Sequence, residues 1–313
     1  YDGSLLFASR LLDHLEGAAL KTAERALRAF FTATGIPEPN PYYTLLIGDG
    51  DFMGRTINRL DTPEKNRQFS LALAGFAAQA IVIVGRHDGA VVYAGGDDVL
   101  ALLPVHTAVP CAAELARTFE ESLRPFGADG ESPTFSVGLA VVHHLEPLED
   151  ALALARDAEK AAKSVPDGKK NALAVALDKR GGTPRLVAGK WGALDRRLLN
   201  LAALHQGGLI PDGLAYQLLA GYHLLGGQKA MKANAGLQPI LALEAERIID
   251  RKRVEGGQRA VDLTHRAYVK QAIADPDTTI ATMADELVIA SLLAKVNALA
   301  GETYPFVEQE VIS

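Results

Sequence analysis

Short apolar runs bounded by glycine, proline or aspartate recur through the first part of the chain and predict β-strands. Between them lie longer stretches whose apolar residues repeat at helical spacing. The predicted strands are Tyr42–Asp49, 90–94 ("AVVYA"), 99–104 ("VLALLP"), Pro133–Val142 and Asn171–Leu177. Because Gly95 and Gly96 separate the second run from the third, these two runs predict a hairpin.

Helices are predicted before and between these strands. One starts at Thr62 and Pro63 and runs to about Val84, and the others are Ser4–Leu15, Ala19–Ala33, Pro110–Leu123 and 147–165. From position 42 the order is strand, helix, hairpin, helix, strand, helix, strand. This order predicts an α+β fold, in which helices pack on one face of a sheet.

The β pattern disappears from about Lys190, and four helical stretches with Gly, Pro and Asp breaks follow it. They cover 190–205, 213–227, 239–253 and 284–300. We therefore expect a helical lead-in over residues 1–40, an α+β domain over 41–182 and an all-α bundle over 183–313.

Composition narrows the class of protein. The 313 residues carry a formal charge of −6, which argues against nucleic-acid binding by bulk charge alone. The single cysteine, Cys111, excludes a disulfide framework within the chain and fits a reducing compartment, so we expect the cytoplasm. The apolar run from Leu71 to Gly85 is shorter than the roughly 20 residues that a bilayer needs, and no membrane span is expected. The chain starts at Tyr1 without a signal-peptide pattern, which suggests the downstream part of a longer product.

Acidic residues follow two of the predicted strands. Asp49 and Asp51 lie in "IGDGDFMG", where the first strand ends, and Asp97 and Asp98 lie in the hairpin. Carboxylates brought together on one sheet edge repel each other unless hard cations such as Mg²⁺ or Mn²⁺ neutralise them. Two such ions can activate an attacking hydroxyl and stabilise a leaving oxygen in phosphoryl displacement. A plain glycine-aspartate turn is the alternative.

Glycines beside these acids favour the catalytic interpretation. Gly50, Gly95 and Gly96 leave room for a triphosphate to approach the backbone. Strand-"GDGD", a long helix and "YAGGDDVLALLP" together resemble the Palm polymerase/cyclase domain of the large subunit of type III CRISPR effector complexes, the Cas10 family. The opening "YDGSLLFASRL" is similar to the segment that precedes this Palm in the Cmr branch.

The resemblance implies a ferredoxin-like Palm related to GGDEF cyclases. It implies that Asp49, Asp97 and Asp98 hold two Mg²⁺ ions, and that ATP is joined into cyclic oligoadenylates when the complex binds target RNA. The partners that it implies are other effector subunits, guide CRISPR RNA, target RNA and a second Palm domain, supplied upstream or by another chain. An HD-type nuclease pattern is missing after His143-His144, so we expect no DNase activity.

Further positions match the family by resemblance. Ser70 corresponds to a position that contacts adenine, and Lys163 and Lys169 correspond to cations near the triphosphate, while Asp51 helps to position the site. The loop after "DGDFMG" lacks the guanine-holding segment of cyclases that use GTP, which favours ATP. Two alternatives remain open, a GGDEF-like cyclase that makes a cyclic dinucleotide and a non-catalytic structural subunit of a ribonucleoprotein.

Overall fold

The computed structural model describes residues 3–127, 132–166, 170–234, 236–251, 263–275 and 278–307. These residues divide into two compact units, Tyr1–Tyr42 and Tyr43–Ser313. The first unit holds a 3₁₀ turn (η1, Gly3–Leu6), one turn of helix (α1, Ala8–Leu11) and α2 (Gly17–Thr34). The predicted helix Ser4–Leu15 is therefore broken. α2 ends at Gly35, whose φ of 66° is the left-handed conformation that glycine adopts without steric cost.

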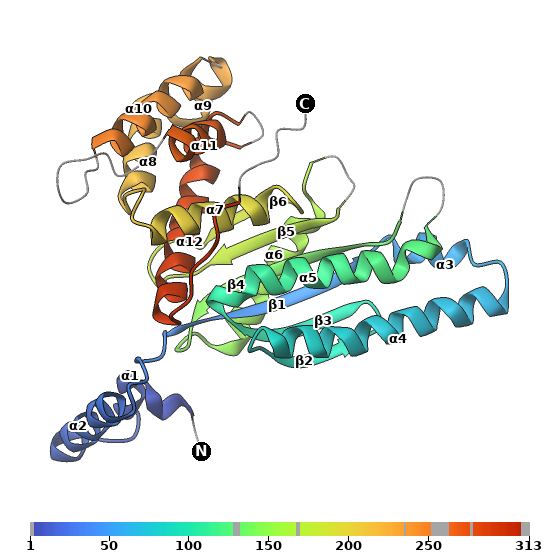
Figure 1. Ribbon diagram of the computed structural model, residues 1–313, viewed down its shortest axis with the longest axis horizontal. Helices are drawn as coiled ribbons and strands as arrows, with labels where there is room; N and C mark the ends of the chain where they lie inside the picture. Colours follow the sequence, from blue (N-terminus) through green and yellow to red (C-terminus); the bar gives the residue numbers. More distant parts are fainter. Residues whose placement is uncertain are drawn as a thin grey trace. The chain divides into compact units, whose positions relative to one another are not determined.

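The second unit is built on one mixed sheet. Its strand order is β2-β3-β1-β4-β5-β6 in the described part of the chain (Figure 1). The strands are β1 (Tyr42–Asp51), β2 (Ala90–Gly95), β3 (Asp98–Pro104), β4 (Thr134–His143), β5 (Ala172–Leu177) and β6 (Arg185–Lys190). β3 runs antiparallel to β1 and β2, β4 runs parallel to β5, and β6 runs antiparallel to β5. The α+β class is confirmed.

Helices cover both faces of this sheet. Phe135 of β4 contacts the rings of Phe76 in α4 (Pro63–Arg86) and Phe119 in α5 (Val105–Leu123). Ala140 of β4 packs instead against Ala155 of α6 (Leu148–Lys163). Odd and even residues of a strand point to opposite faces, so α6 lies across the sheet from α4 and α5. One detail of the expected fold, helices on one face, is corrected here. The cover on both sides explains why β4 is buried along nearly its whole length.

β6 is the strand that the sequence pattern did not predict. Only Val187 within it is fully buried, so the strand shows no apolar alternation. After it come the helices, α7 (Leu194–Gln206), α8 (Leu214–Leu224), α9 (Gly227–Ala233), α10 (Leu237–Arg251), α11 (Leu263–Ala274) and α12 (Ile280–Leu299). α12 is the buried centre of this part and packs against α7 and α8. It also contacts α5 and β6, which joins the helices to the sheet.

α4 differs from its expected character in one respect. Of the helices that the structure describes, α4 alone is long and apolar enough to cross a membrane, whereas the sequence predicted no apolar stretch of that length. The helix packs on α5 and β2 and buries Phe69, Phe76, Ala80, Ile83 and Val84. Only 28% of its apolar stretch is buried, so one side of α4 packs on the unit while Leu71, Ile81 and Val82 are exposed.

Candidate active site

The backbone brings two aspartates face to face. Asp49, near the end of β1, is the register partner of Asp98, the first residue of β3. On the other side of β3, Asp98 pairs with Gly95, which closes the hairpin around Gly96 and Asp97. Gly96 has a φ of 64°, a conformation that favours glycine over residues with a Cβ. The tight turn therefore places Asp97 and Asp98 beside the end of β1.

Gly50 allows this close approach. Its N–H donates a hydrogen bond to the carbonyl oxygen of Asp97 at 3.1 Å. A Cβ at position 50 would lie 2.7 Å from the Cβ of Asp97 and 2.8 Å from Cζ of Phe119, closer than real contacts. Around Gly96, by contrast, an added Cβ would meet no atom within 4 Å, so open space lies there. Gly95 faces the hydroxyl of Tyr93.

The facing carboxyl groups have perturbed acidities. Burial, a hydrogen bond to Asp49 and the charges of Asp49 and Asp97 raise the pKa of Asp98 to about 6. Burial is also the largest cause that raises the pKa of Asp97, and the charge of Asp49 adds to it. The nearby ammonium of Lys163 opposes both shifts. The cluster thus carries more negative charge than its surroundings neutralise.

Lys163 provides the one cation in direct contact with Asp49 in the described part of the chain. It lies at the end of α6, and its Nζ forms ion pairs with carboxylates of Asp49 and Glu159. Burial lowers the pKa of Lys163, but hydrogen bonds to Asp49 and Glu159 outweigh burial and raise it. Sequence reasoning missed Glu159. Its position four residues before Lys163 on a predicted helix is the signal that could have found it.

Asp51 lies elsewhere, fully buried within the sheet. Its Oδ2 accepts hydrogen bonds from Ser136 Oγ at 2.7 Å, Thr134 Oγ1 at 3.0 Å and the N–H of Asn171 at 3.0 Å. Its Oδ1 is 3.9 Å from Nζ of Lys170. Asp51 therefore ties the end of β1 to β4 and to the residues that lead into β5.

The remaining predicted residues are not joined to this cluster by a described contact. Ser70 is exposed on α4, and Lys169 lies outside the described residues. Two cations that the sequence reading did not single out lie over the ring of Phe52, directly after β1. The ammonium of Lys170 is 5.2 Å from the ring centroid and the guanidinium carbon of Arg55 is 4.9 Å from it.

The donor set fits a hard divalent cation in its chemistry. Asp49 and Asp98 supply carboxylate oxygens at adjacent positions, and their mutual repulsion is the kind that a bound cation removes. Within the described ranges, however, no group of three or more potential metal ligands is arranged around one point. The geometry thus supports a site centred on the Asp49–Asp98 pair.

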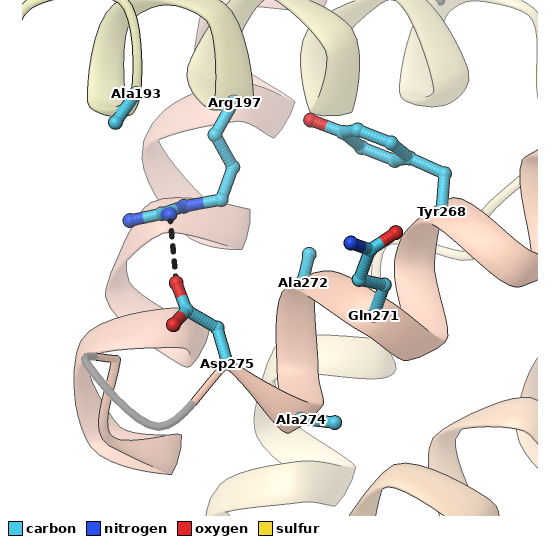
Figure 2. Close-up of a pocket in the computed structure, with 7 residues that line it drawn as sticks. All are labelled: Ala193, Arg197, Tyr268, Gln271, Ala272, Ala274 and Asp275. Atoms are coloured by element: carbon cyan, nitrogen blue, oxygen red, sulfur yellow. Dashed lines mark hydrogen bonds and ion pairs between the residues drawn. The ribbon is translucent and has the colours of Figure 1, made fainter. Parts of the chain in front are cut away.

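A separate cavity of about 360 Å³ lies in the helical part of the unit. Arg197 of α7 lines it together with Tyr268, Gln271 and Asp275, as Figure 2 shows. The guanidinium of Arg197 is already paired, with Asp275 at 3.3 Å and with buried Glu286 at 2.6 Å. None of the clustered aspartates lines this cavity, and it does not belong to the candidate active site.

Comparison with known proteins shows what the α+β part of the chain is similar to. The family model for the second palm domain of Cas10/Cmr2 matches residues 42–174, the stretch that carries the facing aspartates. Residues 42–174, less than half of the chain, thus match the second palm domain of Cas10/Cmr2. The resemblance to the large subunit of type III CRISPR complexes is thereby confirmed.

A curated relative supports the Cas10/Cmr2 assignment. The Cmr2 subunit of the CRISPR Cmr system of Pyrococcus furiosus is 34% identical over an alignment of 174 residues, and the match covers 47% of this chain and 20% of that protein. The chain thus spans about a fifth of the length of this relative.

Solved structures share much of this fold. The apo type III-B Cmr-beta structure has a TM-score of 0.51 at 16% identity and covers 76% of this chain and 37% of its own. The Csm1–Csm4 cassette in complex with cA4 also has a TM-score of 0.51, at 18% identity, over 81% of this chain and 36% of its own. At these identities the likeness shows the fold alone.

Proposed function

We propose that this chain is the catalytic part of a type III CRISPR large subunit that makes cyclic oligoadenylates from ATP when target RNA binds. The observation that carries the proposal is the register pairing of Asp49 with Asp98, with Asp97 next to them in the hairpin. Relatives of the same fold were solved with cA4 and with pppApApA, which supports adenine nucleotides as substrate and product.

In this proposal the residues divide the work. Asp49, Asp97 and Asp98 hold two Mg²⁺ or Mn²⁺ ions, which when bound activate a 3′-hydroxyl for attack on an α-phosphate and stabilise the leaving pyrophosphate. Lys163 and Lys169 neutralise the triphosphate as point charges. The contacts of Asp51 support a role in fixing the end of β1 rather than in touching the nucleotide. Ser70 contacts adenine, and Gly96, around which space is open, admits the phosphates, whereas positions 50 and 95 are already crowded by Phe119 and Tyr93.

The larger assembly belongs to the same proposal. Its parts are other type III effector subunits, guide CRISPR RNA, target RNA and a second Palm domain that faces the hairpin. We propose that the complex lies in the cytoplasm. We also propose that the α+β domain covers residues 41–182 and the helical bundle residues 183–313.

Product analysis tests the proposed activity. The chain, or the complex that contains it, is incubated with ATP or GTP, Mg²⁺ and target RNA, and products are separated by mass. We expect oligoadenylates that disappear when Asp97→Ala and Asp98→Ala are combined and persist in Asp157→Asn, an exposed control. A guanine dinucleotide would support the GGDEF-like cyclase instead. Absence of any product from the complete complex would leave the structural subunit.

A further inference from the structure

Lys163 is shared between two carboxylates that differ in their surroundings. Its Nζ contacts Asp49, which faces Asp98, and Glu159, which lies one helical turn earlier on α6. The Glu159 side chain is 15% exposed and the Lys163 side chain 24%, so both are partly shielded from water. An ammonium in such a place stays beside the site only while a carboxylate holds it.

Packing fixes the position of Glu159 more firmly than that of an ordinary surface residue. α6 lies directly on β4 at Gly138, where an added Cβ would come within 2.2 Å of the Glu159 backbone nitrogen and 2.7 Å of the Ala155 oxygen. The backbone of Glu159 is therefore held against the sheet by the absence of a side chain at Gly138. From this fixed position the Glu159 carboxylate contacts Lys163.

Lys163 cannot keep both of its ion pairs once a divalent cation is bound to Asp49. Under the proposed function Asp49 is a ligand of a divalent cation, and a cation on Asp49 repels the ammonium that now contacts it. Lys163 must then move away from Asp49. Glu159, which is not opposite Asp98 and comes from another element, remains available to it.

We propose that Glu159 is a positioning residue that retains Lys163 beside the site when Asp49 binds a divalent cation. This inference rests on the proposed function and deepens it. Lys163 exchanges one carboxylate for the other and keeps its ammonium free of Asp49, where it meets the triphosphate of ATP. Without Glu159, Lys163 has Asp49 as its carboxylate partner and competes with the cation for it.

Direct binding of Mn²⁺, followed by electron paramagnetic resonance in the full chain, tests the inference without measuring activity. We expect Glu159→Gln to bind Mn²⁺ about tenfold more weakly than the wild type, the effect expected when a supporting partner is lost. The matched control is Asp157→Asn, which removes the same charge from an exposed position of α6 and shifts affinity by less than about twofold. Equal affinity of Glu159→Gln and wild type would overturn the inference.

A double-mutant cycle separates positioning from direct ligation. If Glu159 acts through Lys163, then in a Lys163→Met background the Glu159→Gln change alters Mn²⁺ affinity by less than about twofold. The same tenfold loss in that background would overturn the inference, because Glu159 would then itself be a ligand. Glu159→Asp keeps the charge with a shorter side chain and serves if the glutamine variant does not fold, with a loss expected again.

Steady-state kinetics give a second readout at saturating Mg²⁺. We expect the KM for ATP to rise in Glu159→Gln while kcat changes little. The displaced Lys163 ammonium no longer binds the triphosphate of ATP, and this contact belongs to substrate binding rather than to the chemical step. The failure of the inference is distinct from that of the proposed function. If Asp98→Asn abolishes Mn²⁺ binding and Glu159→Gln does not weaken it, only the inference is overturned. If the wild type binds no Mn²⁺, both are overturned.

Discussion

At the scale of single residues, the two aspartates at the end of β1, Asp49 and Asp51, lie in different surroundings. Asp51 is fully buried, and its Oδ2 accepts hydrogen bonds from donors on β4 and on the segment before β5. Asp49, two residues earlier, faces Asp98 and Lys163 and is partly exposed. The DGD spacing puts both side chains on one face, but only the neighbouring strands decide which of them is buried.

The first prediction concerns the repulsion between Asp49 and Asp98. The pKa of Asp98 is raised to about 6 in the folded protein, so its ionised form destabilises the fold above that pH. Because the side chain is largely exposed to solvent, we expect Asp98→Asn to stabilise the metal-free protein by only about 1 kcal/mol near pH 7.5. Thermal unfolding in EDTA measures this gain.

The dependence on pH gives the control. As the pH falls through about 6 toward 4, wild-type Asp98 takes up a proton in the folded state and its penalty disappears. The melting temperatures of wild type and Asp98→Asn should therefore converge near pH 4. An Asp98→Asn protein that is less stable than the wild type at pH 7.5 contradicts the repulsion.

At the scale of elements, the contact between α6 and β4 carries the cationic side of the site. Both Glu159 and Lys163 are on α6, and the helix can lie this close because residue 138 is glycine. The sequence predicted the helix and the strand separately. It did not predict that they pack on the face opposite α4, because amphipathic periodicity marks a buried face without naming its partner.

The second prediction concerns a substitution at the contact between α6 and β4. Gly138→Ala would place a Cβ against helix backbone, which cannot move aside like the end of a side chain, so α6 must shift. We expect a loss of about 2–3 kcal/mol in the free energy of unfolding, together with loss of the proposed nucleotidyl transfer. Urea denaturation and product analysis measure the two effects.

A matched glycine on α4 provides the control. Gly75 lies inside the helix with no atom within 4 Å of an added Cβ. Gly75→Ala should be neutral or stabilise the protein by up to about 1 kcal/mol, since alanine is the better helix former. If Gly138→Ala behaved like Gly75→Ala, α6 would not be seated on β4 as described.

At the scale of the whole second unit, a buried ion pair joins the helices that follow the sheet. Arg197 of α7 contacts Glu286 of α12 through two hydrogen bonds, at 2.6 and 2.8 Å, and the Glu286 side chain is 1% exposed. Burial raises the pKa of Glu286, and the guanidinium of Arg197 counteracts this rise. The pair fixes which faces of α7 and α12 meet.

The third prediction removes one partner of this pair. Arg197→Ala leaves the Glu286 carboxylate buried without its cation, and we expect a loss of about 3–5 kcal/mol in stability. Because the pKa of Glu286 rises further, part of the loss should be recovered as the pH is lowered from about 7 to 5. Chemical denaturation at several pH values measures both. The exposed neighbour Arg196, changed to alanine, should cost less than about 0.5 kcal/mol at any of them.

The sequence by itself determined most of the local elements and the resemblance to the Cas10 Palm domain. Alternating and helical periodicities are properties of neighbouring residues, and the GDGD and GGDD motifs are contiguous, so both could be read without coordinates. Among the described elements, the predictions omitted β6, which has one fully buried residue and therefore carries almost no pattern, and the helices α3 (Met53–Asn58) and α11 (Leu263–Ala274).

Only the tertiary structure decided which polar and charged groups contact Asp49 and Asp51. Ser136 and Asn171 lie 85 and 120 residues from Asp51, and Lys163 lies 114 residues from Asp49. Contacts at such separations depend on the order of the strands and on the face that each helix covers, neither of which local periodicity encodes. The sequence therefore contained the acids, while packing buried Asp51 and placed Lys163 and its partner Glu159 beside Asp49.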